Sequence, residues 1–223
     1  MKDERKTKKQ LLDELAELRR QIGIGYYALG QHENAIEGYD EAVRLNPKHA
    51  AAYNNRGNAY HALGQQERAI EDYDHAVGLD PEDFAAYNNR GTAYHALGQN
   101  ERAIEDYDEA VRLNPECSAA YNNRGTAYHD LGQHERAIED YDEAIRLDPT
   151  DTEVYINRGN TLSRLCQYAR SLKDYDEAIR LNPEYSDAYN NRGVTLKRLG
   201  KYAESERDFA RAARLRSVSG GGR

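Results

Sequence analysis

The amino-acid sequence predicts an all-α protein, a solenoid of stacked helix-turn-helix repeats, and three observations support this fold class. Marker residues recur with a strict period of 34 residues. Each period holds two segments in which small and aromatic residues follow helical spacing. Each segment ends at a residue that commonly stops a helix. Such a period is typical of units that bury their apolar faces only by stacking on one another.

The period of 34 residues is carried by three kinds of residue. The five prolines keep it: Pro47, Pro81, Pro115, Pro149 and Pro183. One glycine of each unit keeps it: Gly23, Gly57, Gly91, Gly125, Gly159 and Gly193. An aromatic residue keeps it as well: Tyr39, Tyr73, Tyr107, Tyr141, Tyr175 and Phe209. Six units follow, the last of them incomplete: 16–49, 50–83, 84–117, 118–151, 152–185 and 186–216.

Each unit is expected to form a helical hairpin, as the unit 84–117 illustrates. Its first helix has an inward stripe with spacings of four and three: Tyr87, Gly91 and Tyr94. Gly98 then ends this helix, because glycine readily takes the left-handed conformation found after helix ends. The second helix has its own stripe: Ala103, Tyr107, Ala110 and Val111. Small residues on both stripes let the two helices approach closely, and the tyrosines fill the space beside them.

These features resemble the tetratricopeptide repeat family. The resemblance rests on the period, on the order Ala, Tyr, Ala, Pro in the second half of a unit, and on the aromatic residue four positions before the repeated glycine: Tyr53, Tyr87, Tyr121, Tyr155 and Tyr189. It covers residues 16 to about 216. It implies a right-handed superhelical α-solenoid whose concave side is lined by the first helix of each unit. It implies protein binding without naming a partner, because such repeats serve many partners.

A few positions depart from the repeat pattern. Unit 1 has Arg19 where the other units have tyrosine, and units 5 and 6 have Ser171 and Ser205 in place of the first packing alanine of the second helix. Unit 5 has Cys166 at the glycine turn. If the backbone is left-handed there, the cysteine costs up to roughly 1 kcal/mol. The ends of the array are therefore more divergent than its middle.

The composition excludes several classes of protein. The net charge of −8 and the pI of about 5.4 argue against a nucleic-acid-binding surface, which is usually basic. The sequence has no apolar run near 18 residues and no signal-peptide-like start, so we expect a soluble cytoplasmic protein without a membrane span. Two cysteines give no disulfide framework. We expect no cofactor.

A repeated arginine is predicted to pair with a repeated aspartate of the second helix. The arginine lies on or beside the buried face, where a charge needs a partner. Both residues are absent from unit 1, which has Ile22 and Gly38 at these positions, and both are present in every other unit. The pair bridges helices either within a unit or between neighbouring units, and within units its members are Arg56 with Asp72, Arg90 with Asp106, Arg124 with Asp140, Arg158 with Asp174, and Arg192 with Asp208.

The opposite face of each first helix is small and polar, and it is the candidate peptide-binding groove. One amide of this face recurs as a ladder: Asn55, Asn89, Asn123, Asn157 and Asn191. Other members of the face are Asn54, Asn58, Asn88, Thr92, Asn122, Thr126, Asn160 and Asn190. An amide both donates and accepts hydrogen bonds, as a peptide backbone does. The ladder resembles the asparagine ladder in the repeats of O-linked N-acetylglucosamine transferase, which binds extended peptides. The alternative is a solvated face with no dedicated ligand.

Histidines and basic residues add detail to this face. His61, His95 and His129 form a second ladder, but the first and third are expected to lie about 20 Å apart. We therefore expect groove-lining histidines and no metal site. The chain departs from the family's carboxylate clamp at the later basic positions, which hold Ala119 and Asn123. Basic residues occur later instead, and a carboxylate-bearing ligand would prefer that end: Arg164, Lys197 and Arg198.

The two ends lie outside the regular pattern. Residues 1–15 are expected to form a charged helical extension that runs into the first repeat, with a heptad-like stripe at Leu11, Leu15, Leu18 and Ile22. This stripe either caps the solenoid or pairs with another chain. Residues 217–223 are expected to be a flexible tail. The exposed last helix makes a homo-oligomer possible.

The sequence therefore predicts a non-catalytic scaffold that binds an extended peptide segment in the concave groove through its asparagine ladder. The partner is expected to be a protein or peptide of unknown identity. No catalytic arrangement stands out from the repeat background, so we expect no enzyme. The alternative is a structural repeat protein that assembles through its N-terminal helix or by end-to-end stacking.

Overall fold

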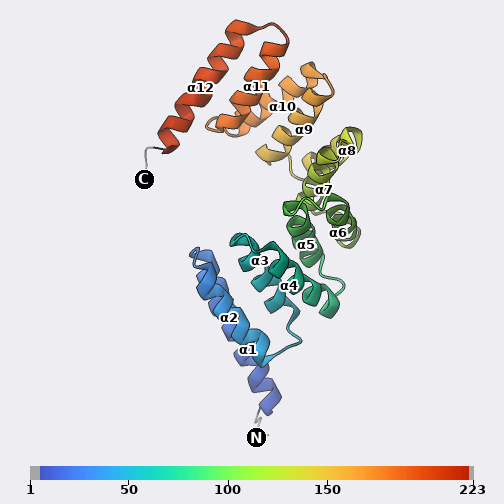
Figure 1. The fold of residues 1–223 in the computed structure, drawn as a ribbon, viewed down its shortest axis with the longest axis vertical. Helices are drawn as coiled ribbons and strands as arrows, with labels where there is room; N and C mark the ends of the chain where they lie inside the picture. Colours follow the sequence, from blue (N-terminus) through green and yellow to red (C-terminus); the bar gives the residue numbers. More distant parts are fainter. Residues whose placement is uncertain (1–5, 221–223) are drawn as a thin grey trace, which may run out of the picture. The chain divides into compact units, whose positions relative to one another are not determined.

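A computed structural model describes residues 6–220 of the chain (Figure 1). Over these residues the secondary structure consists of twelve α-helices without a strand. The chain divides into two compact units, Met1–Pro115 and Glu116–Arg223. The first unit contains α1 (Lys8–Ala28), α2 (His32–Leu45), α3 (Ala50–Ala62), α4 (Gln66–Leu79), α5 (Phe84–Ala96) and α6 (Asn100–Leu113). The second contains α7 (Ser118–Asp130), α8 (His134–Leu147), α9 (Thr152–Arg164), α10 (Tyr168–Leu181), α11 (Ser186–Arg198) and α12 (Tyr202–Gly220).

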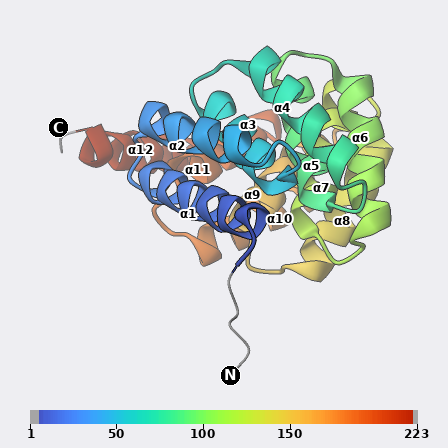
Figure 2. The same cartoon turned by 90° about the horizontal axis from the view of Figure 1, so that it is seen from below.

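The helices pack as hairpins in chain order within each unit. In the first unit α1 packs on α2, α3 on α4 and α5 on α6, and consecutive hairpins meet through α2 with α3 and α4 with α5. The second unit repeats this arrangement with α7 to α12. Figure 2 shows α1 and α2 side by side as one such hairpin. The predicted all-α solenoid of stacked helix-turn-helix repeats is confirmed within each unit.

A glycine of the first helix and a tyrosine of the second determine how closely a hairpin packs. A Cβ atom added to Gly57 would lie 2.6 Å from the ring of Tyr73, which is fully buried. The same contact recurs in the other hairpins, with Phe209 in the place of tyrosine in the last one. Alanines such as Ala69 and Ala76 complete the interface and are also fully buried. As the sequence predicts, small residues bring the helices together and an aromatic ring fills the remaining space.

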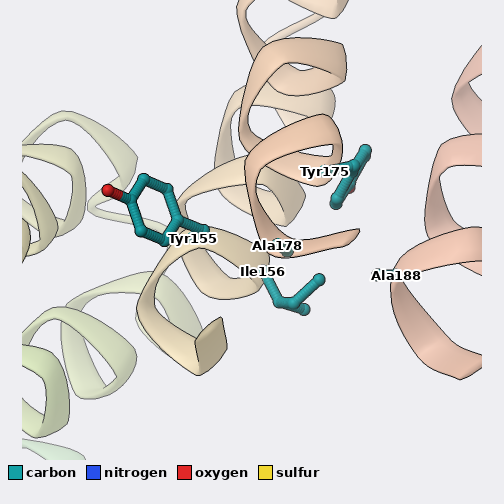
Figure 3. Packing of buried hydrophobic residues seen from close by; sticks show 5 residues of the cluster. All are labelled: Tyr155, Ile156, Tyr175, Ala178 and Ala188. Atoms are coloured by element: carbon teal, nitrogen blue, oxygen red, sulfur yellow. The ribbon is translucent and has the colours of Figure 1, made fainter. Parts of the chain in front are cut away.

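The stacking of successive hairpins extends the core from one repeat to the next. Figure 3 shows Tyr155 and Ile156 of α9 with Tyr175 and Ala178 of α10. These four residues form one buried cluster with Ala188, which belongs to α11 of the following hairpin. Within each unit, consecutive hairpins therefore bury apolar surface against one another as well as within themselves.

The turn inside each hairpin has a left-handed residue. Gly64 has φ of 74°, and the N–H groups of Gly64 and Gln65 donate to the carbonyls of His61 and Tyr60, which is a Schellman helix end. Glycine occupies the same position in every hairpin except that of α9 and α10. There Cys166 has φ of 58°, so the left-handed backbone that we expected at this cysteine is present.

The two ends of the described chain are helical. α1 begins at a capping box formed by Thr7 and Gln10 and continues without a break into the first repeat. Residues 1–5 of the predicted extension lie outside the described residues. α12 continues to Gly220, so residues 217–220, which we expected in a flexible tail, are helical. Residues 221–223 lie outside the described part. None of the described helices is long and apolar enough to cross a membrane.

Candidate functional site

The repeated arginine binds its aspartate through two parallel hydrogen bonds. Arg56 of α3 donates from Nε and Nη2 to the two carboxylate oxygens of Asp72 on α4, at 2.7 and 2.6 Å. Both side chains are largely buried. The hydrogen bond to Asp72 raises the pKa of Arg56, against the opposite effect of burial. The same fork joins the other four predicted pairs: Arg90 with Asp106, Arg124 with Asp140, Arg158 with Asp174, and Arg192 with Asp208.

A second aspartate, which sequence reasoning missed, connects this pair to the preceding hairpin. The Nη1 atom of Arg56 donates to Asp40 of α2 at 2.6 Å. Equivalent bonds join Arg90 to Asp74, Arg158 to Asp142, and Arg192 to Asp176. The sequence does contain a signal for this second aspartate. An aspartate recurs every 34 residues, directly after the buried tyrosine. The guanidinium therefore bridges α2, α3 and α4.

Asparagines of the polar face bond to one another across neighbouring first helices. Nδ2 of Asn89 on α5 donates to Oδ1 of Asn54 on α3 at 3.1 Å. Asn157 on α9 donates to Asn122 on α7 at 3.1 Å, and Asn191 on α11 donates to Asn160 on α9 at 3.0 Å. Each of these bonds uses one of the two N–H groups of the donor. Three of the five predicted ladder residues are therefore held by amide–amide contacts between repeats, which the sequence pattern did not indicate.

Four residues of the predicted polar face also accept a hydrogen bond from the buried tyrosine of their own hairpin. The hydroxyl of Tyr73 donates to Oδ1 of Asn58 at 2.7 Å, and that of Tyr107 donates to Thr92 at 3.3 Å. Tyr141 with Thr126 and Tyr175 with Asn160 repeat this contact. Burial raises the pKa of Tyr107 to about 12, which keeps the hydroxyl protonated as a donor. The last hairpin has Val194 opposite Phe209, so both partners of this bond are apolar there.

The histidine ladder has local partners. Nδ1 of His61 lies 2.5 Å from Oε1 of Gln66 in the same hairpin. Nδ1 of His129 lies 2.8 Å from the hydroxyl of Thr161 in the next hairpin. Burial lowers the pKa of His129, and the nearby His134 acts in the same direction. His129 is therefore a neutral polar side chain near pH 7.

A pocket of about 450 Å³ opens between the first helices of the second unit. It is lined by residues of α7, α9 and α11, with Tyr175 of α10 below them: His129, Asn160, Ser163, Arg164, Asn191, Val194, Thr195 and Arg198. Arg164 and Arg198 are exposed at its edge, and Nη1 of Arg198 lies 3.4 Å from the hydroxyl of Ser163. Of the predicted basic residues, Lys197 is not among those lining the pocket.

Sequence reasoning missed two polar residues in the wall of this pocket. Thr195 and Ser163 are buried, and their hydroxyl oxygens lie 3.3 Å apart. Ser163 stands where the preceding hairpin has His129, and Thr195 stands where repeats 2 to 4 have alanine. The replacement of a histidine by a serine provides room beside the two arginines. A position-by-position comparison of the repeats would have revealed this replacement, whereas a search for residues that recur in every repeat does not.

Comparisons with known proteins agree with the repeat architecture. Family models described as tetratricopeptide repeat match residues 88–152, 152–185 and 174–207. Another, described as TPR repeat, matches residues 25–64 and 57–98. These matches together extend from residue 25 to residue 207. No curated protein matches the chain in a sequence comparison.

Several solved structures have the same fold. The pilF protein of Pseudomonas aeruginosa superposes with a TM-score of 0.81 at 21% identity, over 92% of this chain and 93% of that chain. PilW, described as a widely conserved type IV pilus biogenesis factor, gives a TM-score of 0.81 at 17% identity, over 86% and 90%. YrrB, described as a TPR protein with an unusual peptide-binding site, gives 0.65 at 24% identity, over 81% and 93%. With its repeats, its hairpin geometry and these matches, the chain belongs to the tetratricopeptide repeat family.

Proposed function

We propose that this protein is a non-catalytic scaffold that binds an extended, acidic peptide segment along its first helices. Its membership of a family of protein-interaction repeats supports the general role. The observation that carries the specific proposal is the pocket between α7, α9 and α11, where two arginines stand beside two amides. In this proposal the acidic group of the peptide occupies the pocket, and its backbone follows the asparagines.

The chemistry of the pocket favours a carboxylate as the bound group. Arg164 and Arg198 each present a planar guanidinium, which recognises a carboxylate through two hydrogen bonds. Both arginines occupy the same repeat position, which holds alanine or aspartate in units 2 to 4. His129 adds no positive charge near neutral pH, because burial lowers its pKa. The positive charge of the pocket therefore comes from the two arginines.

The asparagines provide contacts that suit a peptide backbone. Asn157 and Asn191 each use one N–H group in the amide–amide contact, which leaves a second N–H group for a ligand. The oxygen of Asn191 accepts from Asn190 at 3.3 Å and keeps one further lone pair. Neighbouring first helices are spaced by about 10 Å, whereas an extended chain advances about 3.3 Å per residue. One asparagine would thus meet roughly every third residue of the peptide. This spacing supports an extended ligand over a helical one.

The proposal is tested by selecting random peptides on the full-length protein and measuring their affinities by calorimetry. We expect the selected peptides to be rich in aspartate, glutamate or a free C-terminal carboxylate. The double variant Arg164→Ala/Arg198→Ala should weaken binding of these peptides at least about tenfold, because charge-assisted hydrogen bonds are worth roughly 1.5–3 kcal/mol each.

The matched control is Arg170→Ala, which removes an exposed arginine of α10 that bonds only to Gln167 within its own turn. This control should bind the selected peptides with unchanged affinity and show unchanged helical circular dichroism. Selection of peptides without acidic groups, or equal binding by the double variant and the control, would refute the proposed pocket.

A further inference from the structure

The first helix has an apolar stripe that is uncovered in the structure. Leu11, Leu15, Leu18, Ile22 and Leu29 are 53%, 40%, 60%, 47% and 72% exposed. The spacing of the first four places them on one face of α1, in a heptad pattern, and Leu29 follows directly after the last helical residue, Ala28. The buried residues of α1, Ala16 and Gly23, lie on the opposite face, where α1 packs on α2. The hairpin itself therefore leaves the stripe free for another contact.

A comparison with the other repeats indicates what kind of contact suits this stripe. The position of Leu18 is occupied by Ala52 in α3 and by Ala86 in α5, and both alanines are fully buried. The equivalent Ala188 of α11 joins the buried cluster of the preceding hairpin. A stacked hairpin needs such a small residue, because the helices approach closely at this point. Leu18 is a large side chain that is exposed to solvent at this position, as is Leu15. The stripe is therefore shaped for interdigitating side chains and not for a further repeat.

We propose that two copies of this chain associate through α1 as a parallel two-stranded coiled coil. In this heptad Leu15 and Ile22 occupy the a positions, and Leu11 and Leu18 occupy the d positions, before Gly25 follows at the next d position. A β-branched residue at a with leucine at d favours two strands, and the a residue Ile22, which follows Leu18 at d, is β-branched. Leucine and isoleucine from each copy would then cover one another along the exposed face.

The flanking charges select the parallel orientation. Glu14 is a g residue and Arg19 is the following e residue, so a parallel pair places Glu14 of each copy against Arg19 of the other. In the single chain Glu14 forms an exposed ion pair with Lys6, which this contact between copies replaces. In an antiparallel pair, the g residues of one copy face the g residues of the other, and the e residues face the e residues. The g residues are Glu14 and Gln21, and the e residues are Leu12, Arg19 and Tyr26, so that arrangement contains no opposite charges. Only the parallel pair is electrostatically complementary.

The test is the mass of the full chain, measured by sedimentation equilibrium over a concentration series. We expect the wild-type chain to dimerise and the variant Leu15→Gln/Leu18→Gln to remain a monomer of unchanged helicity, because both leucines are exposed in the single chain. The matched control is Leu199→Gln/Tyr202→Gln, which alters two exposed apolar residues far along the sequence. This control should dimerise as the wild type does.

A charge swap tests the orientation separately. Arg19→Glu should weaken the dimer about tenfold, because it places two pairs of like charges across the interface. The combined variant Glu14→Arg/Arg19→Glu should restore wild-type association. A wild-type chain that is monomeric at every concentration, or a dimer that survives Leu15→Gln/Leu18→Gln, would overturn the coiled coil. Failure of the swap to restore association would overturn the parallel orientation.

Discussion

At the scale of the residue, Cys166 is the clearest departure from the repeat. It occupies a left-handed turn position where the other described hairpins have glycine. The Cβ atom of an L-residue is crowded in this conformation, which costs roughly 1–2 kcal/mol. The thiol has one weak contact, a hydrogen bond from the hydroxyl of Tyr168 at 3.4 Å. The local structure of the turn therefore gives no compensation of comparable size.

We expect Cys166→Gly to raise the free energy of unfolding by about 1 kcal/mol, because glycine relieves the crowding but adds freedom to the unfolded chain. Urea denaturation followed by circular dichroism measures the change. Cys166→Ser is the control, since it removes the thiol and keeps the crowded Cβ atom. Equal stabilisation by serine and glycine would show that the thiol, and not the backbone, is responsible.

At the scale of the element, four of the hairpins are closed by a tyrosine hydroxyl and an acceptor on the facing helix. Asn58, Thr92, Thr126 and Asn160 are these acceptors in the hairpins that have them. The last hairpin replaces both groups together, with Phe209 and Val194. A buried hydroxyl that loses its acceptor costs about 1–3 kcal/mol, whereas removal of both groups is nearly neutral. The first hairpin keeps Tyr39 but has Ile24 at the acceptor position. The expected dependence of the two positions on each other therefore rests on the cost of a hydroxyl without its acceptor.

This dependence predicts the outcome of a double-mutant cycle in the hairpin of α3 and α4. Asn58→Val should lower the free energy of unfolding by about 1–2 kcal/mol, because it leaves the hydroxyl of Tyr73 without its acceptor. Adding Tyr73→Phe should recover most of this loss. Thermal unfolding of the wild type, both single variants and the double variant gives the coupling. Simple additivity of the two single effects would contradict the interpretation.

The sequence predicted the elements and one class of contact well. The period and the helical spacing indicated each hairpin, because both follow from local geometry. The bond from Arg56 to Asp72 was predictable because both residues are missing together from the first repeat. The bonds from Arg56 to Asp40 and from Asn89 to Asn54 were not predicted. They join different hairpins, and a residue pattern does not contain the spacing between hairpins.

At the scale of the whole molecule, stability is expected to vary along the array. In repeat proteins it is the sum of each hairpin's own stability and its contacts with neighbours. Within the first unit, α1 and α2 contact one following hairpin, whereas α3 and α4 lie between two. The first hairpin also lacks the internal ion pair, since it has Ile22 and Gly38 at those positions. It should therefore open more readily than its neighbour.

Hydrogen exchange followed by mass spectrometry tests this gradient. In the variant Leu15→Gln/Leu18→Gln, we expect the amides of α1 to exchange faster than those of α3. In the wild-type chain, pairing of α1 with a second copy should slow its exchange below that of the variant. Equal exchange of α1 and α3 in the variant would contradict the gradient.

The two aspartates on either side of the buried tyrosine have a consequence for how such an array grows or shrinks. On α4, Asp72 bonds to the arginine of its own hairpin and Asp74 bonds to that of the next, Arg90. Excision of residues 50–83 would bring Asp40 to the place of Asp74, opposite Arg90. Deletion of this 34-residue block thus leaves Arg90 with both of its carboxylates, and the number of repeats can change in one evolutionary step.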